Sequence, residues 1–267
     1  MFEKHLETAK RVTERASQFD FVEAVAVAGS IRNGFGTESS DVDIYIYTTR
    51  DITLSEREQI AGVDSYNREI IDYWGLCDNF RGEKTDIEVE CMYLPTTFIE
   101  SQLRRVLVDY QPQIGYSTAF WHTVKQSLIL YDRNGWFEAL HQQAQQAYPL
   151  ELKQNIVAQN FPLLAQIPAS YRQQIAKAMK RQDFISINHR ITVFLASYFD
   201  ILFAVNEIPH PGEKRIMEFA AQFTKKPEQM HDHINALWRK FNDPDLIQVI
   251  DSLVWNLEKL LNREGLF

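Results

Sequence analysis

The spacing of apolar residues changes its period once along this chain. Up to about residue 135, short segments in which apolar and polar residues alternate are interleaved with helical segments, whereas from Trp136 onward only the three- and four-residue spacing of helices remains. Alternating segments bury one face and need neighbouring strands. The sequence therefore predicts an α+β fold with two domains, a short mixed β-sheet flanked by helices over residues 1–135 and an all-α helical bundle over residues 136–267.

The first domain is expected to begin with an amphipathic helix over His5–Phe19, and residues 51–72 are expected to be helical at least in part. Strands are predicted at Phe21–Ala28, Val42–Tyr47, Thr85–Tyr93 and Ser127–Gly135. All the predicted strands thus precede the all-helical part of the chain.

In the second domain, the apolar segment Ile191–Val205 is shorter than the roughly 20 residues of a membrane-spanning helix and contains Asp200. We expect it to be a buried central helix. His189 lies about three helical turns before Asp200 and would share its face. We interpret the two as members of a structural hydrogen-bond network, because buried polar groups need partners.

Composition narrows the classes of function. The chain has 267 residues and a formal net charge of −8, which disfavours polymeric nucleic acid and anionic membranes as partners. Cys77 and Cys91 are too few for a disulfide framework or a four-thiolate metal site. The N-terminal residues lack the apolar core of a signal peptide, so we expect a cytoplasmic protein. The oligomeric state is left open.

A glycine and a serine, Gly29 and Ser30, follow a segment predicted to be a buried strand. Small residues there let backbone N–H groups and the serine hydroxyl approach phosphate oxygens. After a loop rich in Gly, Asn and Ser, the next strand begins with Asp41 and Asp43, which point to one face because they are two residues apart. Two such carboxylates repel unless a cation lies between them. The pattern predicts a Mg²⁺ site beside a phosphate-binding loop.

The alternative explanation is a surface hairpin whose Asp and Ser residues stabilise turns. A later acidic strand makes this alternative less favourable, because Asp86, Glu88 and Glu90 share one of its faces and could add a third carboxylate. The combination of the small residues, the paired carboxylates and the acidic strand is more specific than any of its parts.

The stretch "GSIRNGFGTESSDVDIYIY" resembles the signature of the polymerase-β-like nucleotidyltransferases, in which an apolar strand, Gly-Ser and a loop precede Asp-x-Asp on the next strand. The resemblance implies that Gly29 and Ser30 hold a nucleoside triphosphate and that Asp41 and Asp43 bind Mg²⁺. Other segments are similar to a bacterial group with a helical second domain, the layout of kanamycin and lincosamide nucleotidyltransferases: "MYLPTTFIESQL", "GYSTAFWHTVKQSLILYDRNGWF" and "SYFDILFAVNEIPHPGEKR".

This resemblance also implies a third acidic residue, on a strand that runs into a Met-Tyr pair. Counting back from that pair gives Glu90, whereas counting forward from the preceding loop gives Asp86, and Glu88 lies between them on the same face. We rank Glu90 first, Glu88 second and Asp86 third. A glutamate at this position is expected either to complete the metal site or to act as a general base.

Four basic residues are candidates for contacts with the triphosphate. Arg32 and Lys84 could offset its negative charge, and Lys214 and Arg215 lie near the start of a predicted helix, where the N-terminus attracts phosphate. For each of them a solvated surface charge is the alternative.

The resemblance predicts a Mg²⁺-dependent nucleotidyltransferase that uses ATP or another nucleoside triphosphate. It would transfer a nucleoside monophosphate, expected to be AMP, to a hydroxyl of a small molecule such as an antibiotic and release pyrophosphate. The helical domain would contribute most of the acceptor pocket. Two alternatives stay open, namely a protein hydroxyl as the acceptor, or a module that binds nucleotides without turnover.

Overall fold

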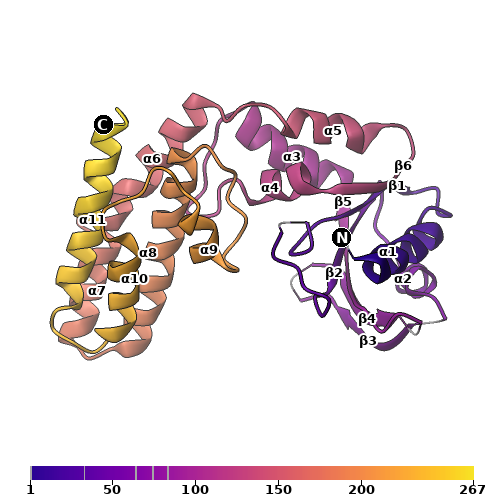
Figure 1. Cartoon of the computed structure of the whole chain (residues 1–267), viewed down its shortest axis with the longest axis horizontal. Coiled ribbons are helices and arrows are strands. Elements are labelled where there is room, and N and C mark those ends of the chain that lie inside the picture. The colour runs from indigo at the N-terminus through magenta and orange to yellow at the C-terminus, as the bar shows by residue number, and fades with distance from the viewer. Residues whose placement is uncertain (1, 33, 64, 74, 83) are drawn as a thin grey trace. The chain divides into compact units, whose positions relative to one another are not determined.

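The computed structural model describes residues 2–32, 34–63, 65–73, 75–82 and 84–267. They form two compact units, one made of residues 1–104 with 120–146 and the other of residues 105–119 with 147–267. The first unit contains the β-sheet, and the second is all-helical (Figure 1). The predicted fold, a mixed sheet flanked by helices and followed by a helical region, is confirmed. The domain boundary at residue 135 stays a prediction.

One sheet organises the first unit. Its described strands are β1 (Val22–Val27), β2 (Val42–Thr48), β3 (Ser65–Ile71), β4 (Cys77–Gly82), β5 (Glu88–Pro95) and β6 (Leu128–Asp132). They lie in the order β3-β4-β5-β2-β1-β6. β2 and β5 are parallel, and the other neighbouring pairs are antiparallel. The two strands that carry the predicted site thus lie side by side in the middle of the sheet.

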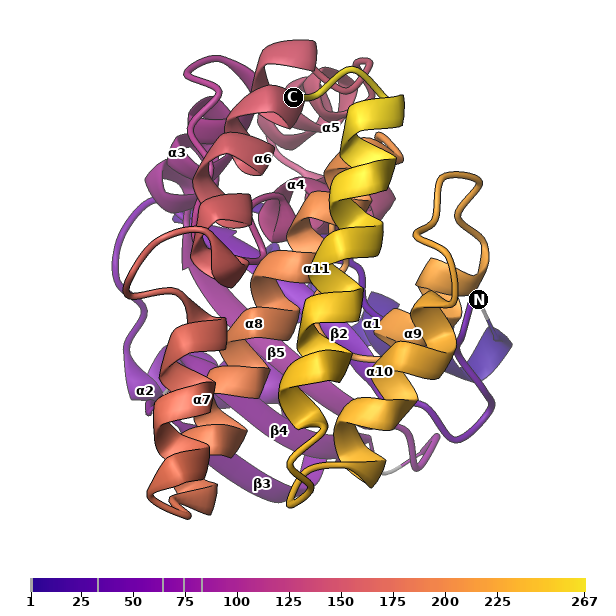
Figure 2. The same ribbon diagram turned by 90° about the vertical axis from the view of Figure 1, so that its left-hand side faces the viewer.

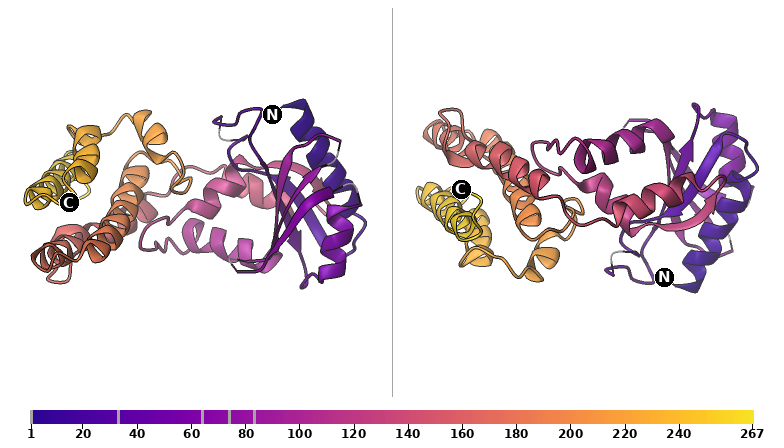
Figure 3. Two further views of the ribbon diagram at one scale, coloured as in Figure 1. Left: turned by 90° about the horizontal axis from the view of Figure 1, so that it is seen from below. Right: turned by 90° about the horizontal axis from the view of Figure 1, so that it is seen from above.

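Helices cover both faces of the sheet. They are α1 (Glu3–Ala16), α2 (Leu54–Ala61), α3 (Thr96–Leu107), α4 (Ala119–Gln126) and α5 (Trp136–Ala144). α1 and α2 pack against the face that contains Val27, Ile44 and Val89. On the other face, the ring of Tyr47 stacks on Phe137 of α5 with centroids 4.6 Å apart. Figure 3 shows α1 on one side of the sheet and α3, α4 and α5 on the other.

The four predicted strands are present as β1, β2, β5 and β6, whereas β3 and β4 were not predicted. Residues 51–72 contain the helix α2, but their last part forms β3. β3 is an edge strand that leaves Tyr66 and Ile70 exposed, so burial does not impose alternation on it. β4 buries Asp78 among apolar residues, where Arg57 pairs with it at 2.7 Å, and this charge obscures the strand pattern.

The second unit is built from helices that share one apolar core. They are α6 (Leu150–Ala165), α7 (Tyr171–Lys180), α8 (Phe184–Val205), α9 (Ile216–Ala221), α10 (Met230–Arg239) and α11 (Leu246–Arg263). α8 packs against α6 and α7, and α10 packs against α11 (Figure 2). From Phe194 onward α8 is almost entirely buried, which confirms the predicted central helix. Among the described residues, no helix has the length and apolarity to cross a membrane.

Asp200, in the buried part of α8, connects the segment 105–119 to the other helices of the second unit by hydrogen bonds. Its Oδ1 accepts a hydrogen bond from the Ser117 amide at 2.9 Å, and its Oδ2 accepts one from the Ser117 hydroxyl at 2.6 Å. Asn160 Nδ2 donates to the same Oδ2 at 3.3 Å. The expected network therefore exists around Asp200, but including His189 in it was wrong, because the first turns of α8 lie at the surface and His189 is exposed.

Burial raises the pKa of Asp200 to about 7, although the hydrogen bonds from Ser117 and the charge of Arg105 act in the opposite direction. The ordinary pKa of an unfolded aspartate is about 3.9. Between these two values the folded protein keeps a proton that the unfolded chain has released. The contribution of Asp200 to stability therefore falls as the pH rises from about 4 to about 7, and it stays lost above that window.

We expect Asp200→Asn to remove this pH dependence, because an amide does not ionise. The free energy of unfolding of the variant, relative to the wild type, should rise between about pH 4 and pH 7 by at most ~1.4 kcal/mol per pH unit. Urea unfolding across this range measures the difference. A flat difference between Asp200→Asn and the wild type would contradict the assignment.

Candidate metal and phosphate site

Two aspartates stand at the beginning of β2. Val42 and Ile44 are fully buried on the α1 side of the sheet, so strand alternation turns Asp43 to the opposite face. Asp41 lies one residue before the strand and, like Asp43, is half-buried. The expected common face for the two carboxylates follows from this local geometry.

The parallel register of β2 and β5 places Glu90 directly beside Asp43. One ligand oxygen from each of Asp41, Asp43 and Glu90 lies within 4.8 Å of the others. This separation is short enough for all three to bind one ion. The geometry thus brings together the two aspartates and the acid ranked first of the three on the later strand.

The other two acids of that strand have partners of their own. Arg81 on β4 pairs with Glu88 at 3.1 Å and with Asp86 at 3.1 Å. Asp86 also accepts a hydrogen bond from the Tyr66 hydroxyl. Neither belongs to the group of three carboxylates. Glu88, ranked second for a catalytic role, is exposed at the start of β5 and is held by a guanidinium instead.

Gly29 is tied to the same group by a close approach. Its φ of +71° lies in the left-handed region, which L-residues rarely adopt. A Cβ at this position would lie 1.6 Å from Asp43 Oδ2, so the carboxylate occupies the space that any other side chain would need. We expected a glycine here for the approach of phosphate. The structure adds a second requirement, which is the approach of Asp43 itself.

The residues after Gly29 form a turn in which the Arg32 amide donates to the Gly29 carbonyl at 3.1 Å. The Ser30 hydroxyl is buried and has no hydrogen-bond partner within the described ranges. Such a group is costly unless a ligand or water satisfies it. Arg32 Nε donates to the Gln126 carbonyl at 3.1 Å, which connects this loop to the end of α4. The orphaned hydroxyl fits a phosphate contact at Ser30.

The negative charge of the site contributes to raised pKa values of two neighbouring side chains, Tyr45 and Cys77. Burial, together with the charges of Asp43 and Glu90, raises the pKa of Tyr45, whose side chain is hydrogen-bonded to Thr123 of α4. Burial and the charge of Glu90 raise the pKa of the Cys77 thiol to about 12. Three carboxylate oxygens in a negatively charged, half-buried place are the donor set that a hard divalent cation such as Mg²⁺ prefers.

Cys77 and Tyr45 were missed as neighbours of the site. Tyr45 carries a sequence signal, because it continues the alternating face of Asp43 two residues later. Cys77 carries none, since its position depends on β4, which the sequence pattern did not reveal.

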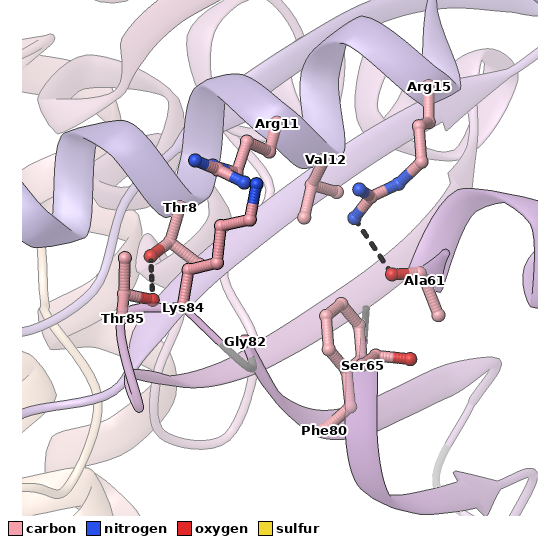
Figure 4. A pocket seen from close by; sticks show the side chains of 10 residues that line it. All are labelled: Thr8, Arg11, Val12, Arg15, Ala61, Ser65, Phe80, Gly82, Lys84 and Thr85. Atoms are coloured by element: carbon pink, nitrogen blue, oxygen red, sulfur yellow. Dashed lines mark hydrogen bonds between the residues drawn. The ribbon is translucent and has the colours of Figure 1, made fainter. Parts of the chain in front are cut away.

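Lys84, predicted to contact the triphosphate, lies away from the group of three carboxylates. It lines a small pocket on the α1 side of the sheet together with Arg11 and Arg15, where Thr8 and Thr85 are joined by a hydrogen bond of 2.7 Å (Figure 4). Strand alternation turns the three carboxylates to the opposite face, so the structure separates Lys84 from them.

Lys214 and Arg215 belong to the second unit. α9 begins at Ile216, after Arg215, whose φ is +55°. The guanidinium of Arg215 forms two hydrogen bonds with Glu218, at 2.7 and 2.6 Å. This ion pair agrees with the alternative of a surface charge, and a phosphate contact of Lys214 or Arg215 stays a prediction.

We expect Gly29→Ala to disrupt the carboxylate group, because the new methyl would displace Asp43. Gly34→Ala is the matched control, since Gly34 also has a positive φ of +80° but a Cβ there meets no described atom within 4 Å. Both variants should lose roughly 1–2 kcal/mol of stability from backbone strain. Only Gly29→Ala should also weaken Mn²⁺ binding, by at least about tenfold. Calorimetric titration measures the affinity, and equal affinities for the two variants would contradict the expectation.

A comparison with family models agrees with the geometry. Residues 7–103, which include Gly29 and all three carboxylates, match the family model of the nucleotidyltransferase domain. No curated protein matches the chain. A nucleotidyltransferase-like protein from Exiguobacterium sibiricum, known from a crystal structure, is similar at 14% identity over 97% of this chain and 75% of that chain, with a TM-score of 0.44. The family match shows that residues 7–103 are similar to a nucleotidyltransferase domain, and the narrower likeness to kanamycin and lincosamide enzymes stays a prediction.

Proposed function

We propose that this protein is a Mg²⁺-dependent nucleotidyltransferase. It moves a nucleoside monophosphate, AMP in the favoured version, from a nucleoside triphosphate to a hydroxyl of a small molecule and releases pyrophosphate. The observation that carries this proposal is the group formed by Asp41, Asp43 and Glu90, whose ligand oxygens lie within 4.8 Å of one another in the region that matches the nucleotidyltransferase domain.

Asp41, Asp43 and Glu90 would hold the divalent cation. When bound, Mg²⁺ would offset phosphate charge and orient the α-phosphate for in-line attack. The hydroxyl of Ser30 and the backbone that follows Gly29 would contact the outer phosphates, because a buried unpartnered hydroxyl can donate to an anionic oxygen. Arg32, in the same loop, is a further candidate for a phosphate contact.

In the proposed reaction, the acceptor oxygen bonds to the α-phosphorus as the bond to the bridging oxygen of pyrophosphate breaks. The hydroxyl proton must pass to a base. Glu90 is the candidate for this base on this chain, as the alternative to its role as a metal ligand. Its place in the group of three carboxylates, beside Asp43, supports the role of metal ligand.

The expected test is calorimetric titration of ATP, GTP, CTP and UTP, with and without Mg²⁺, into the wild type and single variants. We expect Mg²⁺-dependent binding of ATP, weakened at least about tenfold by Asp43→Asn and by Glu90→Gln, since losing a direct ligand should cost no less than losing an outer partner. Glu88→Gln is the matched control. It removes the same charge from the same face of β5, two residues away, where Arg81 holds the carboxylate.

Equal losses for Glu88→Gln and Glu90→Gln would contradict the choice of the third carboxylate. Binding of none of the four nucleotides would overturn the proposed function. Where binding is found, pyrophosphate release in the presence of candidate acceptors tests the transfer. Nucleotide binding without Mg²⁺-dependent release would favour a binding module, and an added nucleotide mass on a co-expressed protein would favour a protein acceptor.

A further inference from the structure

β4 and β5 place their side chains in register on the face that carries the carboxylates. Arg81 lies opposite Glu88, and Asn79 lies opposite Glu90. Cys77 is two residues from Asn79 along β4, so its side chain lies on the same face. The two glutamates of β5 therefore meet different partners on β4.

The contacts show this difference directly. Arg81 Nη2 lies 3.1 Å from Glu88 Oε2, so a cation holds this carboxylate. The Cys77 thiol donates to Glu90 Oε1 at 3.5 Å, and Asn79 Oδ1 lies within reach of the same thiol at 3.7 Å. Cys77 is 7% exposed, so little water competes for these contacts.

A charged partner and a neutral partner have opposite consequences for metal binding. The guanidinium of Arg81 offsets the charge of Glu88, which lies outside the group of three carboxylates. A thiol is an uncharged and weak donor, so it orients a carboxylate without offsetting its negative charge. Glu90 is thus held in place and still offers its full charge to a cation.

We propose that Cys77 is a positioning residue of the metal site, whose neutral thiol fixes Glu90 toward Asp43. The inference rests on the proposed function, because it assumes that the carboxylate group binds a divalent cation. It assigns a role to a residue outside that group. The register of β2 and β5 brings Glu90 beside Asp43, and the thiol then orients its carboxylate.

The first test is Mn²⁺ affinity, measured by calorimetry and by electron paramagnetic resonance on the full chain. Cys77→Ala removes the donor, and Cys77→Ser keeps a neutral donor. Outer partners of metal ligands typically matter by 10–100-fold, and a thiol is a weaker donor, so we expect Cys77→Ala to weaken Mn²⁺ binding by roughly 3–10-fold. Cys77→Ser should stay within about twofold of the wild type.

Cys91→Ala is the matched control, because Cys91 is the other of the two cysteines and is buried in the core on the opposite face of the same sheet. It should lower the melting temperature without changing Mn²⁺ affinity. Wild-type affinity in Cys77→Ala, or a serine variant as weak as the alanine variant, would overturn the role of Cys77 while leaving the metal site intact. Failure of the wild type to bind Mn²⁺ would overturn the proposed function and this inference with it.

A second measurement tests the hydrogen bond between Cys77 and Glu90 directly and needs no bound metal. The infrared S–H stretching band of Cys77 is identified by its loss in Cys77→Ala. In the wild type it should lie at lower frequency than in Glu90→Ala, because a carboxylate is a stronger acceptor than the Asn79 amide. An identical band in both proteins would show that the thiol does not donate to Glu90 and would overturn the inference.

Discussion

The parallel pairing of β2 with β5 is the constraint on which the candidate site depends. Its register places Glu90 beside Asp43 in the middle of the sheet. A slip of one residue would turn Glu90 to the face that packs against α1, and a slip of two residues would bring Glu88 to this position. The register is held by the core on the other face, where Val42, Ile44 and Val89 are fully buried. The apolar side of the sheet thus determines which acids meet on its polar side.

The carboxylate group is joined to the preceding loop by shape as well as by charge. Because Asp43 Oδ2 occupies the place of a missing Cβ at Gly29, the loop that begins there cannot move independently of β2 without losing this contact. The same loop carries the buried hydroxyl of Ser30. Three clustered carboxylates and one unpartnered donor are each unfavourable alone. A divalent cation that carries phosphate would relieve both, which makes the two parts a single candidate site.

Buried charge serves a different purpose in each unit. In the first unit, the guanidinium of Arg57 forms an ion pair with the buried carboxylate of Asp78, so β4 can contain an aspartate at a buried position. In the second, Asp200 has hydrogen-bond donors but no ion pair among its described contacts, and burial raises its pKa to about 7. The second arrangement makes the attachment of residues 105–119 sensitive to pH.

The sequence by itself determined the elements with strong periodicity and the residues with local meaning. The alternation in β2 and β5, the short apolar segments that form β1 and β6, the buried part of α8, and the pair of aspartates two residues apart all follow from the residue pattern along the chain. Only the tertiary structure brought Glu90, rather than Glu88 or Asp86, within reach of the two aspartates, placed Cys77 beside it, and gave Asp200 its partners. These depend on strand register and on contacts between residues far apart in the sequence, and a one-dimensional pattern does not encode which strands become neighbours.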